Sequence, residues 1–146
     1  MRIIGCGNRD RGDDGAGILV AERLRSLGVE ADIRSGEGLE LLEAWRGIED
    51  CIVVDAVSTG APAGTIRTWE AHDLSQFPSA SLSTHGFGVA EAIRLAIVLG
   101  CLPRRLRIYG IEGGRFDPGV DPTPEVSRAI ERVAGEIARV AGGTQR

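Results

Sequence analysis

Apolar residues along the chain alternate between short continuous runs and stretches with helical spacing. Arg2–Gly5, Cys51–Asp55 and Leu106–Ile111 are short runs typical of buried strands, and the second (C-I-V-V-D) is apolar up to its final Asp. Val29–Arg34 and Thr65–Trp69 alternate apolar and polar residues, as half-buried strands do. We therefore predict five strands, with the 65–69 strand antiparallel to its neighbour.

Helix-spaced apolar residues predict four helices between these strands. The first ends at Gly28, the second covers Leu39–Trp45, and the third ends at Gly100. The fourth follows Thr123, a predicted cap, with Pro124 at its first position. The residues that recur at helical spacing in the first and third helices are Ala16, Val20, Leu24 and Leu27, and Val89, Ile93, Ala96 and Ile97. The predicted buried stripe of the fourth helix is Ile130, Val133, Ala134, Ile137 and Val140.

This alternation of strands and helices predicts one α/β domain spanning residues 1–146. The predicted architecture is a three-layer α/β/α fold, with a mostly parallel five-stranded sheet and one antiparallel strand. In such sheets, ligands bind at the carboxyl ends of the strands where the strand order reverses. If the order begins 2-1-3, that position lies between the first and third strands, whose ends lead to Asp14 and carry Asp55.

The composition excludes several classes of function. The net charge is −4 and no cluster of Arg is evident, so a nucleic-acid partner is not expected. All 17 basic residues are Arg, which excludes Schiff-base, pyridoxal-phosphate, P-loop and Ser–Lys chemistry. Three separated Cys residues fit reduced thiols in a cytoplasm. We see no signal-peptide pattern and no run of about 18 apolar residues, so a cytoplasmic protein without membrane contact is predicted.

The opening segment, Gly5–Gly17, combines five glycines with acidic residues. A dinucleotide-binding loop is a poor interpretation, because Asp10 occupies the third glycine position and would face the pyrophosphate. The glycines themselves indicate tight backbone turns. Two adjacent carboxylates are hard to explain as one helix cap, so we expect Asp13 to cap the helix while Asp14 projects into the crevice.

Asp55 and His85 are the other candidate site residues. Asp55 could simply start a turn, or it could be held rigidly at the end of a buried strand. His85 lies in S-T-H-G-F-G just before a helix, whereas His72 is expected to be structural or exposed. With Asp14, these residues form two carboxylates and one imidazole, a partial shell suited to a divalent ion. Cys6 could be a nucleophile, but a small buried thiol is the favoured interpretation.

Four motifs in order give the chain a resemblance to the [NiFe]-hydrogenase maturation endopeptidases over nearly its whole length. The opening G-x-G-N-x-x-x-x-D-[DE]-G-x-G is similar to Gly5–Gly17, and the family's V-D-A is similar to Val54–Ala56. The histidine signature is similar to Thr84–Gly88. The late G-I-E…P-G…T-P-E-V stretch is similar to residues 110–112, 118–119 and 123–126.

The resemblance implies an aspartyl-type endopeptidase that cuts a C-terminal extension from the hydrogenase large-subunit precursor after nickel insertion. It also implies that Asp14, Asp55 and His85 are the metal-contacting and catalytic residues. The nickel belongs to the substrate, and no organic cofactor is expected. Position 14 holds Asp where several relatives have Glu. Because Asp is shorter, the ion would have to lie closer to the backbone or bind the carboxylate through a water molecule. We expect a monomer or a weak homo-oligomer.

Two other functions stay open at this point. A resident-metal hydrolase or phosphatase of a small substrate would bind a divalent ion tightly without a partner protein. A non-catalytic nickel chaperone would bind the metal and the precursor but leave the extension intact.

Overall fold

The computed structural model describes residues 1–8, 10–71 and 88–143. They form a five-stranded sheet of order β2-β1-β3-β5-β4, in which only β4 is antiparallel to its neighbour. The strands are β1 (Arg2–Cys6), β2 (Asp32–Arg34), β3 (Asp50–Val57), β4 (Ile66–Glu70) and β5 (Arg105–Glu112). The helices are the short 3₁₀ helix η1 (Gly12–Gly15), α1 (Ala16–Ser26), α2 (Gly38–Trp45), α3 (Val89–Leu99) and α4 (Pro124–Gly143). The predicted fold class is confirmed.

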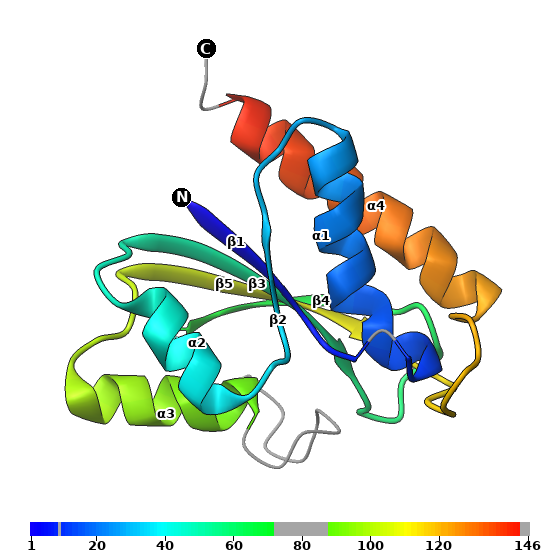
Figure 1. Cartoon of the computed structure of the whole chain (residues 1–146), viewed down its shortest axis with the longest axis horizontal. Helices are drawn as coiled ribbons and strands as arrows, with labels where there is room; N and C mark the ends of the chain where they lie inside the picture. The colour runs from blue at the N-terminus through cyan, green and yellow to red at the C-terminus, as the bar shows by residue number, and fades with distance from the viewer. Residues whose placement is uncertain (9, 72–87, 144–146) are drawn as a thin grey trace.

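The helices form a layer on each face of the sheet, α1 and α4 on one side and α2 and α3 on the other (Figure 1). Successive strand residues alternate between the two layers, as the pleat requires. Ile3 and Val54 belong to the core under α1 and α4, whereas their neighbours Ile4 and Val53 belong to the core under α2 and α3. Burial on both faces explains why the central strands are continuously apolar in sequence.

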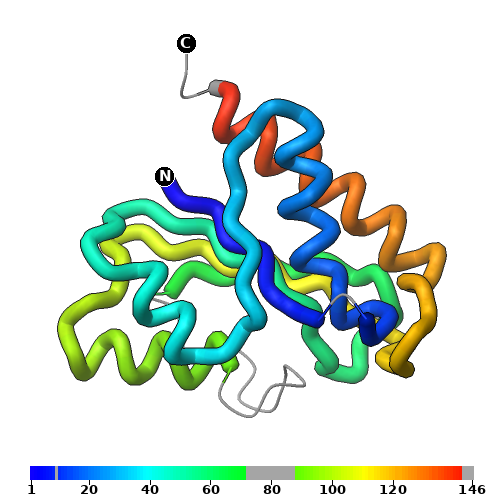
Figure 2. The backbone as a smooth tube through the Cα atoms, viewed as in Figure 1, coloured from blue at the N-terminus to red at the C-terminus, as the bar shows by residue number. Residues whose placement is uncertain are grey.

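The strand order reverses next to β1. The chain passes from β1 through α1 to β2 on one side, and then through α2 to β3 on the other side of β1 (Figure 2). The start of α1 is packed directly onto both strands at this point. A Cβ at Gly17 would lie 2.3 Å from the carbonyl oxygens of Cys6 and Val54, so only glycine fits. The glycine therefore fixes how the turn that carries Asp14 meets β3.

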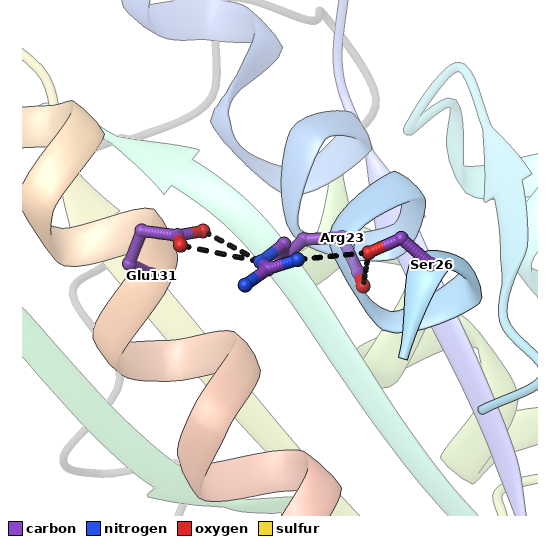
Figure 3. A network of polar contacts seen from close by, with 3 residues as sticks. All are labelled: Arg23, Ser26 and Glu131. Atoms are coloured by element: carbon purple, nitrogen blue, oxygen red, sulfur yellow. Dashed lines mark hydrogen bonds and ion pairs between the residues drawn. The ribbon is translucent and has the colours of Figure 1, made fainter. Parts of the chain in front are cut away.

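The outer layer formed by α1 and α4 is joined at its surface by a polar network (Figure 3). The Nε of Arg23 on α1 donates to both carboxylate oxygens of Glu131 on α4, at 3.2 and 3.0 Å. The same guanidinium donates to the hydroxyl of Ser26 at 3.1 Å. All three side chains are exposed, so the pair contributes little beyond the apolar contacts beneath it.

Several sequence predictions need correction in detail. β3 continues two residues past Asp55 to Val57, so Asp55 is not at the tip of its strand. β2 is shorter than predicted, covering only Asp32–Arg34. Val140 was expected in the buried stripe of α4, but its exposed fraction is 42%. The helix-spaced residues Leu27 and Ile97 are also exposed, at 46% and 50%. Each lies at or near the C-terminal end of its helix, where little packs against it.

No helix in the described ranges is both long and apolar enough to cross a membrane.

Candidate functional site

Asp14 and Asp55 are brought together at the carboxyl edge of the sheet, beside the strand-order reversal. Asp14 lies in η1, directly after β1, and Asp55 lies in β3, the strand next to β1. Both side chains are buried, with exposed fractions of 1% and 3%. Burial raises the pKa of Asp55 well above its usual value, and the nearby charge of Asp14 raises it further. The two predicted carboxylates therefore interact electrostatically across 41 positions of sequence.

The backbone around the opening glycines holds Asp14 in place. Its carbonyl oxygen accepts a hydrogen bond from the Asn8 amide at 3.1 Å. Gly7 has φ of +142°, and a Cβ there would lie 2.0 Å from the same carbonyl oxygen. The expectation of a glycine-dependent turn is thus confirmed at this position, and the turn sets where the Asp14 side chain begins.

Asp55 has one hydrogen bond that counteracts its raised pKa. Its Oδ1 accepts from the Ala56 amide at 2.9 Å, which lowers the pKa, but by less than burial and Asp14 raise it. Asp55 follows Val53 by two residues, so its side chain points to the face covered by α2 and α3. A buried carboxyl with one such donor, next to a second carboxyl, favours the protonated form or a bound cation.

Asp13 has a structural role different from the one predicted. It does not cap the helix, because η1 and α1 have no side-chain cap. Its Oδ2 instead accepts from the amides of Gly114 (2.7 Å) and Arg115 (2.9 Å), and its Oδ1 accepts from the Thr123 amide at 2.7 Å. The Thr123 hydroxyl, at 3.2 and 3.3 Å from the two oxygens, also contacts this carboxylate. Asp13 therefore anchors the loop between β5 and α4 beneath the site.

Glu112 is a buried carboxylate to which sequence reasoning gave no role. It ends β5 and is 2% exposed. Its Oε2 accepts from the Thr59 amide at 2.8 Å, and its Oε1 accepts from the Thr59 hydroxyl at 2.6 Å. The signal was present, since an acidic residue at the end of an apolar strand resembles the pattern around Asp55. Glu112 holds the loop between β3 and β4 at the same edge of the sheet.

Cys6 is a buried thiol beside the acidic pair. Its side chain is fully buried, and burial raises the pKa of the thiol well above 9.0, with Asp55 adding to the effect. A protonated thiol is a poor nucleophile. The interpretation of Cys6 as a small buried residue is confirmed.

His85 and His72 lie outside the described residues. Within the described ranges, no group of three His, Cys, Asp or Glu side chains is arranged to hold a metal ion. Asp14 and Asp55 are the two described carboxylates that could contribute to such a site. The assignment of Asp14, Asp55 and His85 as a metal-contacting trio therefore stays a prediction.

A cavity in the described part of the chain lies away from these carboxylates. It has a volume of about 690 Å³ and lies at the amino ends of β1 and β2, between Arg2, Arg25 and Asp32. The carboxyl edge, where α/β sheets bind ligands, is at the other end of these strands. We therefore base the site on the carboxylate pair and not on this cavity.

Comparison with known proteins places the chain in a family. Residues 36–140 match the family model described as HycI, hydrogenase maturation protease. The chain is 30% identical over 154 residues to the hydrogenase expression/formation protein HupD of Thiocapsa roseopersicina, covering 94% of this chain and 70% of HupD. It is 26% identical to the putative hydrogenase maturation protease MJ0253 of Methanocaldococcus jannaschii, covering 94% and 96%.

Solved structures agree with the fold. The hydrogenase maturating endopeptidase HybD from Escherichia coli has a TM-score of 0.78 and 25% identity, covering 98% of this chain and 94% of HybD. The [NiFe] hydrogenase maturation protease HybD from Thermococcus kodakarensis also has a TM-score of 0.78, with 21% identity, covering 97% and 99%. With the match of the family model over residues 36–140, these likenesses establish that the chain belongs to the hydrogenase maturation protease family.

Proposed function

We propose that this chain is an endopeptidase that removes the C-terminal extension of a [NiFe]-hydrogenase large-subunit precursor after nickel insertion. The observation that carries the proposal is the meeting of Asp14 and Asp55, two buried carboxylates, at the ligand-binding edge of the sheet. Family membership supplies the reaction class. The precursor and the dependence on nickel come from the family resemblance.

The electrostatics of the pair support a role in contacting a cation. The charge of Asp14 raises the pKa of Asp55, and a divalent cation beside the two carboxylates would offset this repulsion. In the proposed complex, that cation is the nickel carried by the precursor, and His85 joins the two acids. The protease would then recognise a substrate whose nickel is already in place.

Hydrolysis itself requires a water molecule and a proton acceptor. The water oxygen attacks the scissile carbonyl carbon while one proton passes to a carboxylate. The same proton then passes to the leaving amine as the carbon–nitrogen bond breaks. Asp55 suits this role because its raised pKa brings it closer to the working pH than an exposed Asp would be. Holding the peptide next to the carboxylates supplies much of the remaining rate.

The test compares nickel-loaded and nickel-free precursor as substrates. We expect the loaded precursor to lose its extension and the nickel-free form to stay intact. Equal cleavage of both would overturn nickel-gated recognition while leaving the peptidase assignment in place. Binding of the loaded precursor without cleavage would instead favour a nickel chaperone. Tight metal binding by the purified chain alone would favour a resident-metal hydrolase.

A further inference from the structure

The carboxyl edge also carries a cation that the proposed chemistry does not use. Arg34 ends β2, and β2 pairs with β1 so that Arg34 lies beside Cys6. Gly5 pairs with Val54, so the next position on β3 beside Cys6 is Asp55. Arg34, Cys6 and Asp55 therefore form one row across three neighbouring strands. In parallel strands, paired residues project to the same face, which here is the face covered by α2 and α3.

The Arg34 side chain is partly buried, and its Nε lacks a hydrogen-bond partner among the described residues. Its charge acts on the site, since it lowers the pKa of the Cys6 thiol, though less than burial raises it. A buried N–H without an acceptor destabilises the folded protein, because its hydrogen bond to water is lost and not replaced. Such a group is retained most readily where a ligand completes it.

The acidic residues nearest to Arg34 are engaged elsewhere. Asp32, two residues earlier on the same face, pairs with Arg2 at 3.6 Å. Glu40 of α2 accepts a hydrogen bond from the Ser35 hydroxyl. Within the described residues, neither carboxylate accepts a hydrogen bond from the Nε of Arg34. The described residues therefore supply no acceptor for the Nε–H of Arg34.

From this geometry we propose that Arg34 is a specificity residue, which donates its Nε–H to an oxygen acceptor of the bound precursor segment. The inference rests on the proposed function, because it assumes a peptide bound at Asp55. Arg34 lies two strands from Asp55, and strands are about 4.8 Å apart, so the two Cα atoms are separated by roughly 10 Å. An extended peptide advances about 3.3 Å per residue, so the acceptor lies about three residues from the residue held at Asp55.

The acceptor can be a backbone carbonyl or an acidic side chain of the precursor. Both present an oxygen to the guanidinium, and a carboxylate would add charge attraction. The two acceptors can be distinguished by substitution in the precursor, because an acidic side chain can be replaced by its amide whereas a backbone carbonyl cannot.

The experiment measures kcat and KM on nickel-loaded precursor for the wild type, Arg34→Met, Arg34→Lys and Arg46→Met. Arg46 is an exposed arginine at the end of α2 and serves as the matched control. We expect Arg34→Met to raise KM by about 10- to 100-fold with kcat little changed, because one charge-assisted hydrogen bond to the substrate is lost. Arg34→Lys should be intermediate, because it keeps the charge but not the Nε–H. Arg46→Met should match the wild type.

A second arm distinguishes the two acceptors. Each acidic residue within about five positions of the cut is replaced by its amide in the precursor, since the acceptor is expected about three residues away. Suppose that one such precursor variant raises the KM of the wild-type enzyme but does not raise the KM of Arg34→Met further. The acceptor is then the carboxylate that was replaced. If no precursor variant behaves in this way and Arg34→Met still raises KM, the acceptor is a backbone carbonyl. An unchanged KM for Arg34→Met and Arg34→Lys overturns the proposal.

A measurement of precursor binding separates this inference from the proposed function, because binding can be measured even when no cleavage occurs. If the wild type cleaves no precursor, the peptidase assignment fails, and calorimetry of precursor binding then decides about Arg34. Weaker binding by Arg34→Met than by the wild type and Arg46→Met supports the inference. Equal binding, or no binding by any variant, overturns it.

Discussion

Two sets of buried carboxylates lie at the same edge of the sheet and differ in how their charge is accommodated. Asp13 accepts three backbone hydrogen bonds and contacts a hydroxyl, and Glu112 accepts from both the amide and the hydroxyl of Thr59. Asp55 accepts a hydrogen bond from the adjacent Ala56 amide and faces the charge of Asp14. The first set stabilises loops, whereas Asp55 is a buried carboxyl with a raised pKa at the edge of the sheet where α/β folds bind ligands. Burial alone therefore does not separate structural acids from candidate site acids, but the raised pKa of Asp55 beside a second carboxyl does mark it as a candidate.

The largest effect is expected from Asp55→Asn. We expect cleavage of the nickel-loaded precursor to fall by about 10²- to 10⁴-fold, because the proposed proton acceptor is removed. The melting temperature should stay equal or rise, because a buried like-charge repulsion is also removed. Time courses on gels and thermal unfolding provide the two measurements. Wild-type cleavage by this variant would show that Asp55 belongs with the structural set.

Asp13→Ala should show the opposite behaviour. It leaves the amides of Gly114, Arg115 and Thr123 without their acceptor, so we expect a loss of about 3–5 kcal/mol in the free energy of unfolding. Urea unfolding measures this loss. Any loss of activity should be proportional to the fraction unfolded. A fully stable but inactive Asp13→Ala protein would break the distinction between the two sets.

The pH dependence of stability sharpens the comparison further. The folded protein holds the Asp55 proton more tightly than the unfolded chain, because the pKa of Asp55 is raised. The stabilising contribution of the protonated carboxyl is therefore complete below the usual value of 3.8, and it is lost as the pH rises through the raised value.

Urea unfolding of metal-free protein at several pH values, with Asp55→Asn as the reference, measures this contribution. Wild-type stability should fall relative to the variant as the pH increases from 4 toward neutrality. Parallel curves for the two proteins would contradict the raised pKa.

The smallest effect is expected from the surface pair of Arg23 and Glu131. A double-mutant cycle with Arg23→Met and Glu131→Gln should give a coupling energy below about 1 kcal/mol, because both side chains are exposed. The coupling should weaken further at high salt. A coupling several times larger would mean that the contact between α1 and α4 depends on this pair more than on its apolar core.

Local patterns were sufficient to predict most elements of the fold. Helical spacing and Gly100 located α3, because the glycine adopts the left-handed conformation that ends helices. The antiparallel strand also followed from the alternation of apolar and polar residues, whereas the order 2-1-3 around β1 was only a condition, which the structure meets. Strand ends were less accurate: β3 continues past Asp55 because its backbone still pairs with β5 at Val57, a contact that the local sequence does not encode.

The site was predictable only in part, and Asp13 shows why. Its hydrogen-bond partners lie 101 to 110 positions away, so no local pattern separates it from Asp14 beside it. Asp14 and Asp55 could be proposed because the strand order brings their two elements to one edge. The Nε of Arg34 is buried without an acceptor because of the residues that β1 and α2 place around it. The sequence alone gave no indication of this environment.

The contact of Gly17 with two strands determines how the two acids are held relative to each other. The segments that carry the two acids contact each other at Gly17, where there is no space for even one methyl group. A larger residue at position 17 would move the turn that carries Asp14 away from the strand that carries Asp55 before it disturbed the rest of the core. The relative position of the two carboxylates is thus set by a residue that has no side chain.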